Sequence, residues 1–95
     1  MTTDGPPAGG SYAISAAARI VGTGQQNLRL YERRGLLAPR RTQGGTRRYS
    51  EANLVTLRRI AELLAEGLNL SGVALVLTLE AENASLRAEL DRSRP

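Results

Sequence analysis

The stretch SAAARIVGTGQQNLRLYERRG, residues 15–35, contains two short apolar patterns on either side of a glycine. Ser15 can N-cap a first helix over residues 16–21, because its hydroxyl can accept a hydrogen bond from a free N–H group of the first turn. Alanines and Ile20 give this helix a small inner face. Gly22 then supplies a sharp turn.

A second helix is predicted from residue 23 or 24 to Arg34. Leu28 and Tyr31 are three residues apart and therefore share the inner face of this helix. Gly35 is placed to end it in the left-handed conformation. Two short helices around a glycine turn are typical of a helix-turn-helix, whose second helix enters the major groove of DNA with its N-terminal residues against the base edges.

Three amide side chains occupy the first turn of the second helix: Gln25, Gln26 and Asn27. An amide can donate and accept at once, so each can pair bidentately with N7 and N6 of adenine. The alternative, that short polar residues merely solvate the start of a helix, stays open for each of the three taken alone. Arg29 follows the three amides, and the helix start offers free N–H groups to a phosphate. We therefore expect the DNA-reading surface here.

Residues 36–49 predict a small hairpin. Pro39 interrupts any helix, and residues 43–45, Gln-Gly-Gly, form a hairpin-type turn. Four arginines flank this turn: Arg40, Arg41, Arg47 and Arg48. A two-stranded wing that carries these arginines can lie along phosphates or reach into the adjacent minor groove.

A third helix is expected to begin at a Ser50 cap and to end near Gly67. Its apolar residues recur at helical spacing and should cover the small core: Leu54, Leu57, Ile60, Ala61 and Leu64. We expect Ser71 to cap a fourth helix that runs from Gly72 to about Asp91.

The fourth helix has the pattern of a coiled-coil seam. Residues follow one another at intervals of three and four: Val76, Leu79, Asn83, Leu86 and Leu90. An asparagine at one core position commonly fixes the register of such a seam at a cost in stability. The end of the helix has nothing left in this chain to pack against, so we expect it to dimerise. The alternative is a helix that packs on its own domain and leaves its tail exposed.

The composition excludes several classes of site. The 95 residues include neither cysteine nor histidine. Thiol- or imidazole-bound metals and the usual nucleophile–base pairs are therefore absent from the sequence. We expect no enzyme activity, no metal site and no cofactor. No apolar run is long enough to cross a membrane and no signal pattern is visible, so we expect a cytoplasmic, nucleoid-associated protein.

The charge is divided unevenly along the chain. All thirteen basic residues are arginine, which the codon usage of a GC-rich genome explains better than function does. The distribution is informative, because residues 19–59 hold ten arginines against two acids, a net charge of +8. Residues 60–95 hold three arginines against six acids, a net charge of −3. This asymmetry is typical of a nucleic-acid-binding region joined to a region with another role.

The segment over residues 12–60, YAISAAARIVGTGQQNLRLYERRGLLAPRRTQGGTRRYSEANLVTLRRI, resembles the DNA-binding domain of the MerR family of bacterial regulators. Its most specific parts are LRLYERRGLL at 28–37 and RRYS at 47–50, and the resemblance continues through EGLNLSGVALVL. Leu30 stands where the family often has a second tyrosine. RRTQGGTRRYS and EGLNLSGV are similar to the heat-shock repressor branch.

The resemblance implies a mainly α fold: a winged helix-turn-helix with a small β-hairpin wing and a C-terminal dimerisation helix that forms an antiparallel coiled coil. By position it implies base contacts from Gln25, Gln26 and Asn27. It also implies DNA contacts from further residues of the second helix and the wing: Arg29, Tyr31, Arg47, Arg48 and Tyr49. Tyr49 can equally be a core residue whose hydroxyl reaches solvent.

We expect a disordered tail over residues 1–11, a winged helix-turn-helix over 12–70, a dimerisation helix over 71–91 and a tail over 92–95. The predicted function is a homodimeric regulator, more readily a repressor, that binds double-stranded DNA at a pseudo-palindromic operator. We expect no small-molecule effector, so the regulatory input would come from a partner protein, from the protein's own abundance, or from a chaperone as in the heat-shock branch. The alternatives are an excisionase-like architectural factor that bends DNA and an adaptor that recruits another protein.

Overall fold

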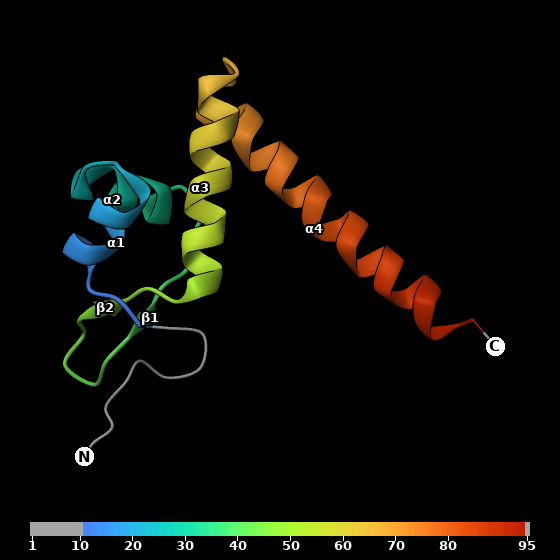
Figure 1. Cartoon of the computed structure of the whole chain (residues 1–95), viewed down its shortest axis with the longest axis horizontal. Coiled ribbons are helices and arrows are strands. Elements are labelled where there is room, and N and C mark those ends of the chain that lie inside the picture. The colour runs from blue at the N-terminus through green and yellow to red at the C-terminus, as the bar shows by residue number, and fades with distance from the viewer. Residues whose placement is uncertain (1–10, 95) are drawn as a thin grey trace. The chain divides into compact units, whose positions relative to one another are not determined.

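The computed structural model describes residues 11–94 and is mainly helical, with one small hairpin (Figure 1). Its elements in chain order are α1 (Ile14–Val21), α2 (Gln25–Arg33), β1 (Arg40–Arg41), β2 (Arg47–Arg48), α3 (Glu51–Ala65) and α4 (Leu70–Arg92). The predicted fold class is confirmed. The predicted disordered tail lies outside the described residues except for Ser11.

The chain divides into two compact units, residues 1–62 and 63–95. The first unit contains α1, α2, the hairpin and most of α3. The second contains the end of α3 and all of α4. The division falls inside α3, earlier than the boundary predicted at residues 70–71.

Helix α1 begins earlier than predicted. Its N-cap is Ala13, which makes no side-chain cap, so the expected Ser15 cap is wrong. The reason lies in the preceding residue, because the N–H and C=O groups of Tyr12 both bond to Tyr49 at 2.8 Å and hold the chain extended up to the start of the helix. Gly22 ends α1 in the left-handed conformation at φ 79°, as predicted.

Helix α2 begins after Gly24 and ends at Arg33, within one or two residues of the prediction. Leu28 and Tyr31 are its buried residues, as their spacing indicated. Gly35 has a φ of 77°, and the next N–H group, of Leu36, donates to the Tyr31 carbonyl at 2.9 Å. The left-handed glycine therefore closes the C-terminus of the helix and turns the chain towards the wing.

The wing is an antiparallel pair in which Arg40 lies opposite Arg48 and Arg41 lies opposite Arg47. Its loop is closed by a hydrogen bond from the Thr42 N–H group to the Thr46 carbonyl at 2.8 Å. Like charges that face each other across a strand pair destabilise it. Two consecutive pairs of opposed arginines therefore need opposite charge or polar partners from elsewhere in the chain.

Helix α3 has the cap predicted at Ser50. The Asn53 N–H group donates to the Ser50 hydroxyl at 3.0 Å, and the Ser50 N–H group donates to the Asn53 side-chain oxygen at 2.8 Å. This reciprocal pair satisfies two N–H groups at the helix start.

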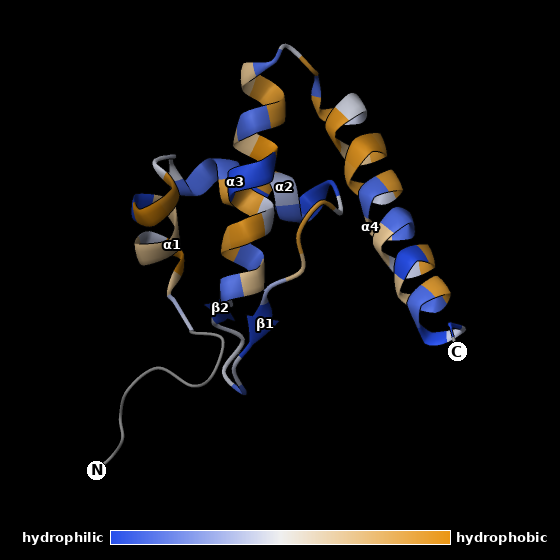
Figure 2. Cartoon of the chain, turned by 45° about the vertical axis from the view of Figure 1, so that its right-hand side comes forward, coloured by the Kyte–Doolittle hydropathy of each residue, from blue (hydrophilic) through white to orange (hydrophobic). Residues whose placement is uncertain are grey.

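The buried stripe of α3 differs in part from the prediction. Leu54, Leu57 and Ile60 are buried as expected, but Ala61 is exposed and Leu64 is only half-buried. Leu63 is buried instead, since a step of three residues from Ile60 continues the stripe along the same face. Figure 2 shows apolar colour recurring along α3 and α1, whereas β1 and β2 are hydrophilic.

Helix α4 is capped by Asn69, so the expected Ser71 cap is wrong. The Asn69 side-chain oxygen accepts a hydrogen bond from the Gly72 N–H group at 2.8 Å. Gly67, with a φ of 99°, reverses the chain just before this cap. Ser71 consequently lies two residues after the cap, within the first turn of the helix. Among the described residues, no helix is both long and apolar enough to span a membrane.

The two cap candidates of α4 can be separated by substitution. Asn69→Ala should lower the free energy of unfolding by about 0.5–2 kcal/mol, because one N–H group of the first turn loses its partner. Ser71→Ala should change it by less than about 0.5 kcal/mol, as an exposed position away from special features does. Urea unfolding monitored by circular dichroism measures both. A larger loss for Ser71→Ala would contradict the observed cap.

Candidate nucleic-acid interface

The three amides at the start of α2 are not equivalent in the structure. Asn27 is half-buried and donates from its side-chain nitrogen to the Thr23 hydroxyl at 2.7 Å. Gln25 is half-buried and accepts from Arg29 at 3.4 Å, which is a long hydrogen bond. Gln26 alone among the three is exposed. It is therefore the amide most freely offered to a base edge, while Asn27 ties the helix start to the preceding turn.

Gly24 makes room for Gln26. A methyl group added at Gly24 would approach the side-chain oxygen of Gln26 to 2.6 Å, so the amide lies over the glycine. Gly24 is also the N-cap of α2 and provides no side-chain cap. The start of the helix is thus lined by backbone and by the Gln26 amide, a combination that suits an approaching nucleic acid.

Both tyrosines predicted to contact DNA lie in the core. Tyr31 is 7% exposed and Tyr49 is 0% exposed. Burial raises the pKa of each phenol. For Tyr49 this burial supports the core interpretation, although its hydroxyl does not reach solvent and has no hydrogen-bond partner in the described structure.

The wing arginines are held by internal partners to different degrees. Arg48 donates to the hydroxyl and to the carbonyl of Ser11, both at 3.0 Å. Arg41 donates to the Gly45 carbonyl at 3.2 Å and to the Glu32 carboxylate at 2.9 Å. Arg47 donates through Nε to the other oxygen of the same carboxylate. Arg40 is exposed and has no hydrogen-bond or ion-pair partner among the described residues.

Glu32 therefore connects α2 to both strands of the wing, a role that the sequence patterns did not indicate. Its side chain is 20% exposed. Burial raises the pKa of its carboxyl, but the hydrogen bonds and charges of Arg47 and Arg41 lower the pKa by more, so that the net shift is downward. The signal available in the sequence was that Glu32 is the sole acid between residues 5 and 50.

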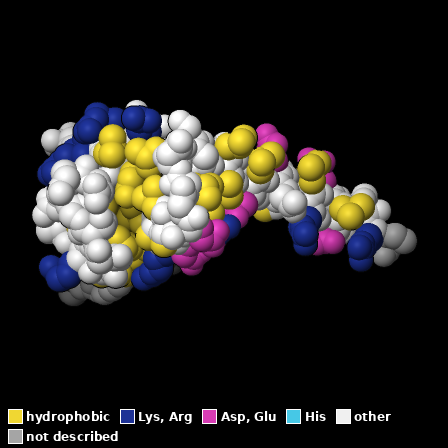
Figure 3. Space-filling view, turned by 90° about the horizontal axis from the view of Figure 1, so that it is seen from above, with side chains coloured by type: hydrophobic (Ala, Val, Ile, Leu, Met, Phe, Trp, Pro, Cys, Tyr) yellow, Lys and Arg dark blue, Asp and Glu magenta, His cyan; other side chains and the backbone are white. Residues whose placement is uncertain are grey.

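The first unit presents a surface rich in arginine. Figure 3 shows arginine side chains gathered at its margins. The exposed arginines of α1, α2, the wing and α3 are Arg19, Arg29, Arg33, Arg34, Arg40, Arg41 and Arg58. Arg40 and Arg41 were predicted as wing residues but not as site residues. Such a set of cations can neutralise phosphates irrespective of base sequence.

The predicted seam of α4 is largely uncovered. Leu79, Leu86 and Leu90 are 53%, 64% and 58% exposed, and Val76 is half-buried. Leu75, which the seam did not include, is also exposed. Figure 3 shows yellow apolar side chains recurring along this helix.

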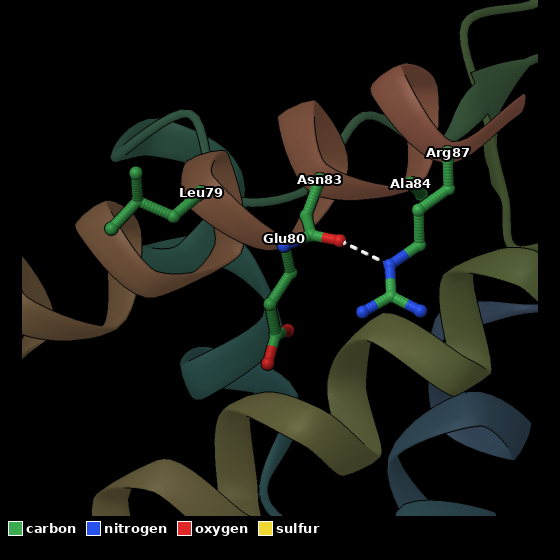
Figure 4. A pocket seen from close by; sticks show the side chains of 5 residues that line it. All are labelled: Leu79, Glu80, Asn83, Ala84 and Arg87. Carbon is green, nitrogen blue, oxygen red and sulfur yellow. Dashed lines mark hydrogen bonds between the residues drawn. The ribbon is translucent and has the colours of Figure 1, made fainter. Parts of the chain in front are cut away.

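Asn83 interrupts the apolar side chains of α4. Its side-chain oxygen accepts a hydrogen bond from Nε of Arg87 at 2.6 Å. Figure 4 shows these two residues beside an open hollow on the helix, lined by Leu79, Glu80, Asn83, Ala84 and Arg87. The hollow is bounded by α4 residues alone, so it is a feature of one exposed helix face and has no enclosed floor.

Comparison with known proteins identifies one family of regulatory proteins. The model of the MerR HTH family of regulatory proteins matches residues 12–80. The putative heat shock protein HspR of Streptomyces coelicolor is 44% identical over 78 residues, which are 81% of this chain and 52% of that protein. The HTH-type transcriptional repressor CarH of Myxococcus xanthus is 37% identical over 91 residues, which are 90% of this chain and 30% of that protein. The chain thus spans about half or less of the length of these two relatives.

Solved structures agree on the fold. A MerR-family transcriptional regulator from Bacillus cereus superposes with a TM-score of 0.67 at 24% identity, over 86% of this chain and 71% of that chain. HiNmlR, a MerR-family regulator lacking the sensor domain and solved bound to promoter DNA, gives a TM-score of 0.67 at 22% identity, over 85% of this chain and 79% of that chain.

The contact between Glu32 and the wing predicts a pH dependence of stability. The carboxyl has a lowered pKa in the folded protein, so its contribution is present above the unfolded pKa, roughly 4.3, and is lost as the pH falls through the folded pKa. Wild type should exceed Glu32→Gln in free energy of unfolding at pH 7, by up to about 1 kcal/mol, and the difference should shrink in acid. Urea unfolding between pH 3 and 7 measures it.

The same comparison in an Arg47→Gln background provides the control. Removing one of the two cations should reduce the pH-dependent difference between the proteins with and without Glu32. A difference of equal size in both backgrounds would mean that the ion pair with Arg47 does not contribute to stability.

Proposed function

Because this chain belongs to the MerR family of helix-turn-helix regulatory proteins, we propose that it is a transcriptional regulator that binds double-stranded DNA as a homodimer. The observation that carries this proposal is the start of α2, where an exposed Gln26 lies over Gly24 in a unit with many exposed arginines. The name of CarH as a transcriptional repressor supports repression as its effect.

In the proposed complex, α2 lies in the major groove with its N-terminal turn against the base edges. Gln26 pairs with an adenine through its amide, and Gln25 becomes available when its long bond to Arg29 opens. Asn27 reaches a base only if its 2.7 Å bond to Thr23 breaks, so we expect it to contribute less to sequence choice than Gln26.

Arginines supply most of the affinity in this proposal. Arg29 on α2 and the exposed Arg40 on the wing contact phosphates directly. Arg47 and Arg48 do so through the nitrogens that their internal partners leave open. Tyr31 of α2 and Tyr49, which directly follows β2, support these elements from within the core. If six to eight phosphates are neutralised, the logarithm of the binding constant falls with the logarithm of salt with a slope of about −6.

The proposed dimer forms through α4. Its four exposed leucines lie on a helix whose described residues from 78 onward are all exposed, so a second copy offers the apolar surface that one chain lacks. Asn83, within this face, would select the register of the pair. Two copies would place two α2 helices in successive major grooves, which requires a pseudo-palindromic operator.

The proposed place of action is the nucleoid in the cytoplasm, since the target is chromosomal DNA. Repression is relieved through a protein co-regulator, of which a chaperone is the example that the resemblance to the heat-shock repressor branch implies. No small-molecule effector site is proposed in these 95 residues.

The division between base and phosphate contacts can be tested with an operator selected in vitro by the wild-type protein. Gln26→Ala should weaken binding by about 1–3 kcal/mol and relax preference at one position of each half-site. Arg29→Ala should weaken binding to all sequences alike and make the salt slope shallower by about 1. Fluorescence anisotropy at several salt concentrations, with operator and random duplexes, measures both. Identical behaviour of the two variants on random DNA would contradict the assignment.

The proposed interface can be tested with one added charge. Leu79→Asp should give monomers, because an unpaired carboxylate would be buried at the seam. Ala81→Asp is the matched control, since this exposed position two residues further on α4 points to another side of the helix and should leave the dimer intact. Sedimentation velocity measures the state of both. A dimeric Leu79→Asp variant would place the interface elsewhere.

A further inference from the structure

We propose that Glu32 is a positioning residue for DNA recognition: by binding Arg41 and Arg47 together, it holds the wing on α2 and limits contacts with non-specific DNA. The proposal rests on the DNA-binding function proposed above. It assigns a role in specificity to an acidic residue that contacts no base and that would repel phosphate if it acted alone.

The geometry that carries it is a three-residue bridge. Arg41 of β1 and Arg47 of β2 are direct partners across the hairpin. One carboxylate oxygen of Glu32 accepts from Arg41 at 2.9 Å, and the other accepts from Arg47. Glu32 belongs to the last turn of α2, so a single side chain connects the reading helix to both strands of the wing.

The bridge also removes a repulsion within the wing. Two arginines directly opposite each other destabilise a strand pair, and a carboxylate that pairs with both adds two attractions that offset this repulsion. The arginines of the neighbouring pair differ in their partners. Arg48 bonds to Ser11, and the side chain of Arg40 has no hydrogen-bond or ion-pair partner among the described residues. Among the described residues, Glu32 is therefore the carboxylate that pairs with the arginines of the wing.

The donors that remain decide how the wing can meet DNA. Arg47 uses Nε for Glu32, and its two terminal nitrogens have no hydrogen-bond partner within residues 11–94 and can still donate to phosphate. Arg41 uses one hydrogen of each terminal nitrogen, for Glu32 and for the Gly45 carbonyl, and keeps its other donors. The bridge consequently holds two guanidiniums in place instead of leaving them mobile, with a net charge of +1 for the three residues.

This arrangement favours the operator over other DNA. On the operator, α2 fixes the distance to the backbone, so an oriented Arg47 meets a phosphate without loss of side-chain freedom. On random DNA, affinity depends mainly on the number of cations that can reach phosphates. A neutral residue at position 32 would release Arg41 and Arg47 and would therefore strengthen non-specific binding more than operator binding.

The test compares Glu32→Gln with wild type on a selected operator and on a mixed-sequence duplex of equal length. One additional phosphate contact steepens the salt slope on the mixed duplex by about 0.9, which is up to about tenfold in affinity at 0.1 M salt. Operator affinity should rise less or fall, so that the ratio of the two affinities decreases. Glu62→Gln is the matched control, since it removes the same charge from an acid that bonds to Arg59 of its own helix.

The outcomes are distinguishable. If the wild-type protein shows no salt-dependent binding to either duplex, the proposed function fails and this inference falls with it. If wild type binds but Glu32→Gln and Glu62→Gln show equal salt slopes and equal affinity ratios, the inference alone is wrong. If Glu32→Gln weakens binding to both duplexes by the same factor and lowers the melting temperature, Glu32 has only a structural role and the inference is also wrong.

Discussion

A repulsion that the chain must overcome shapes the first unit: the wing places Arg41 opposite Arg47 and Arg40 opposite Arg48. Such a hairpin is destabilised by its own residues, because each cross-strand pair carries two positive charges. The opposing groups come from distant parts of the chain. Glu32 reaches from α2, and Ser11 reaches from the segment before α1. The contacts of Glu32 and Ser11 that offset this repulsion therefore also attach the wing to the helix-turn-helix.

The buried tyrosines extend this attachment into the core. The backbone of Tyr49 pairs with Tyr12 directly after β2, and its side chain is completely buried. The same residue precedes the Ser50 cap of α3. Tyr49 thus connects the segment before α1, the wing and the start of α3, whereas ion pairs connect the wing to α2. In the proposed complex, the distance between reading helix and wing depends on both kinds of contact.

The sequence identified the helices, the glycine turns and the wing, because each of these depends on neighbours within a few residues. The Ser50 cap was correctly predicted for this reason, since its partner Asn53 is three positions away. The Ser15 and Ser71 caps were wrong because the path of the preceding chain decides where each helix begins: after Ala13, without a side-chain cap, and after Asn69, with one. The prediction that Ala61 is buried was wrong because steps of three and of four residues both fit the same apolar pattern, and packing buries Leu63 instead.

For the candidate site, the sequence by itself determined which residue types are available: amides at the start of α2, arginines on the wing, and leucines along α4. The tertiary structure decided which of them are free. It exposes Gln26, buries Tyr31 and Tyr49, and joins Glu32 to arginines nine and fifteen positions away. The physical reason is that local periodicity and capping act over one or two turns of chain, whereas ion pairs and burial depend on segments that only folding brings together.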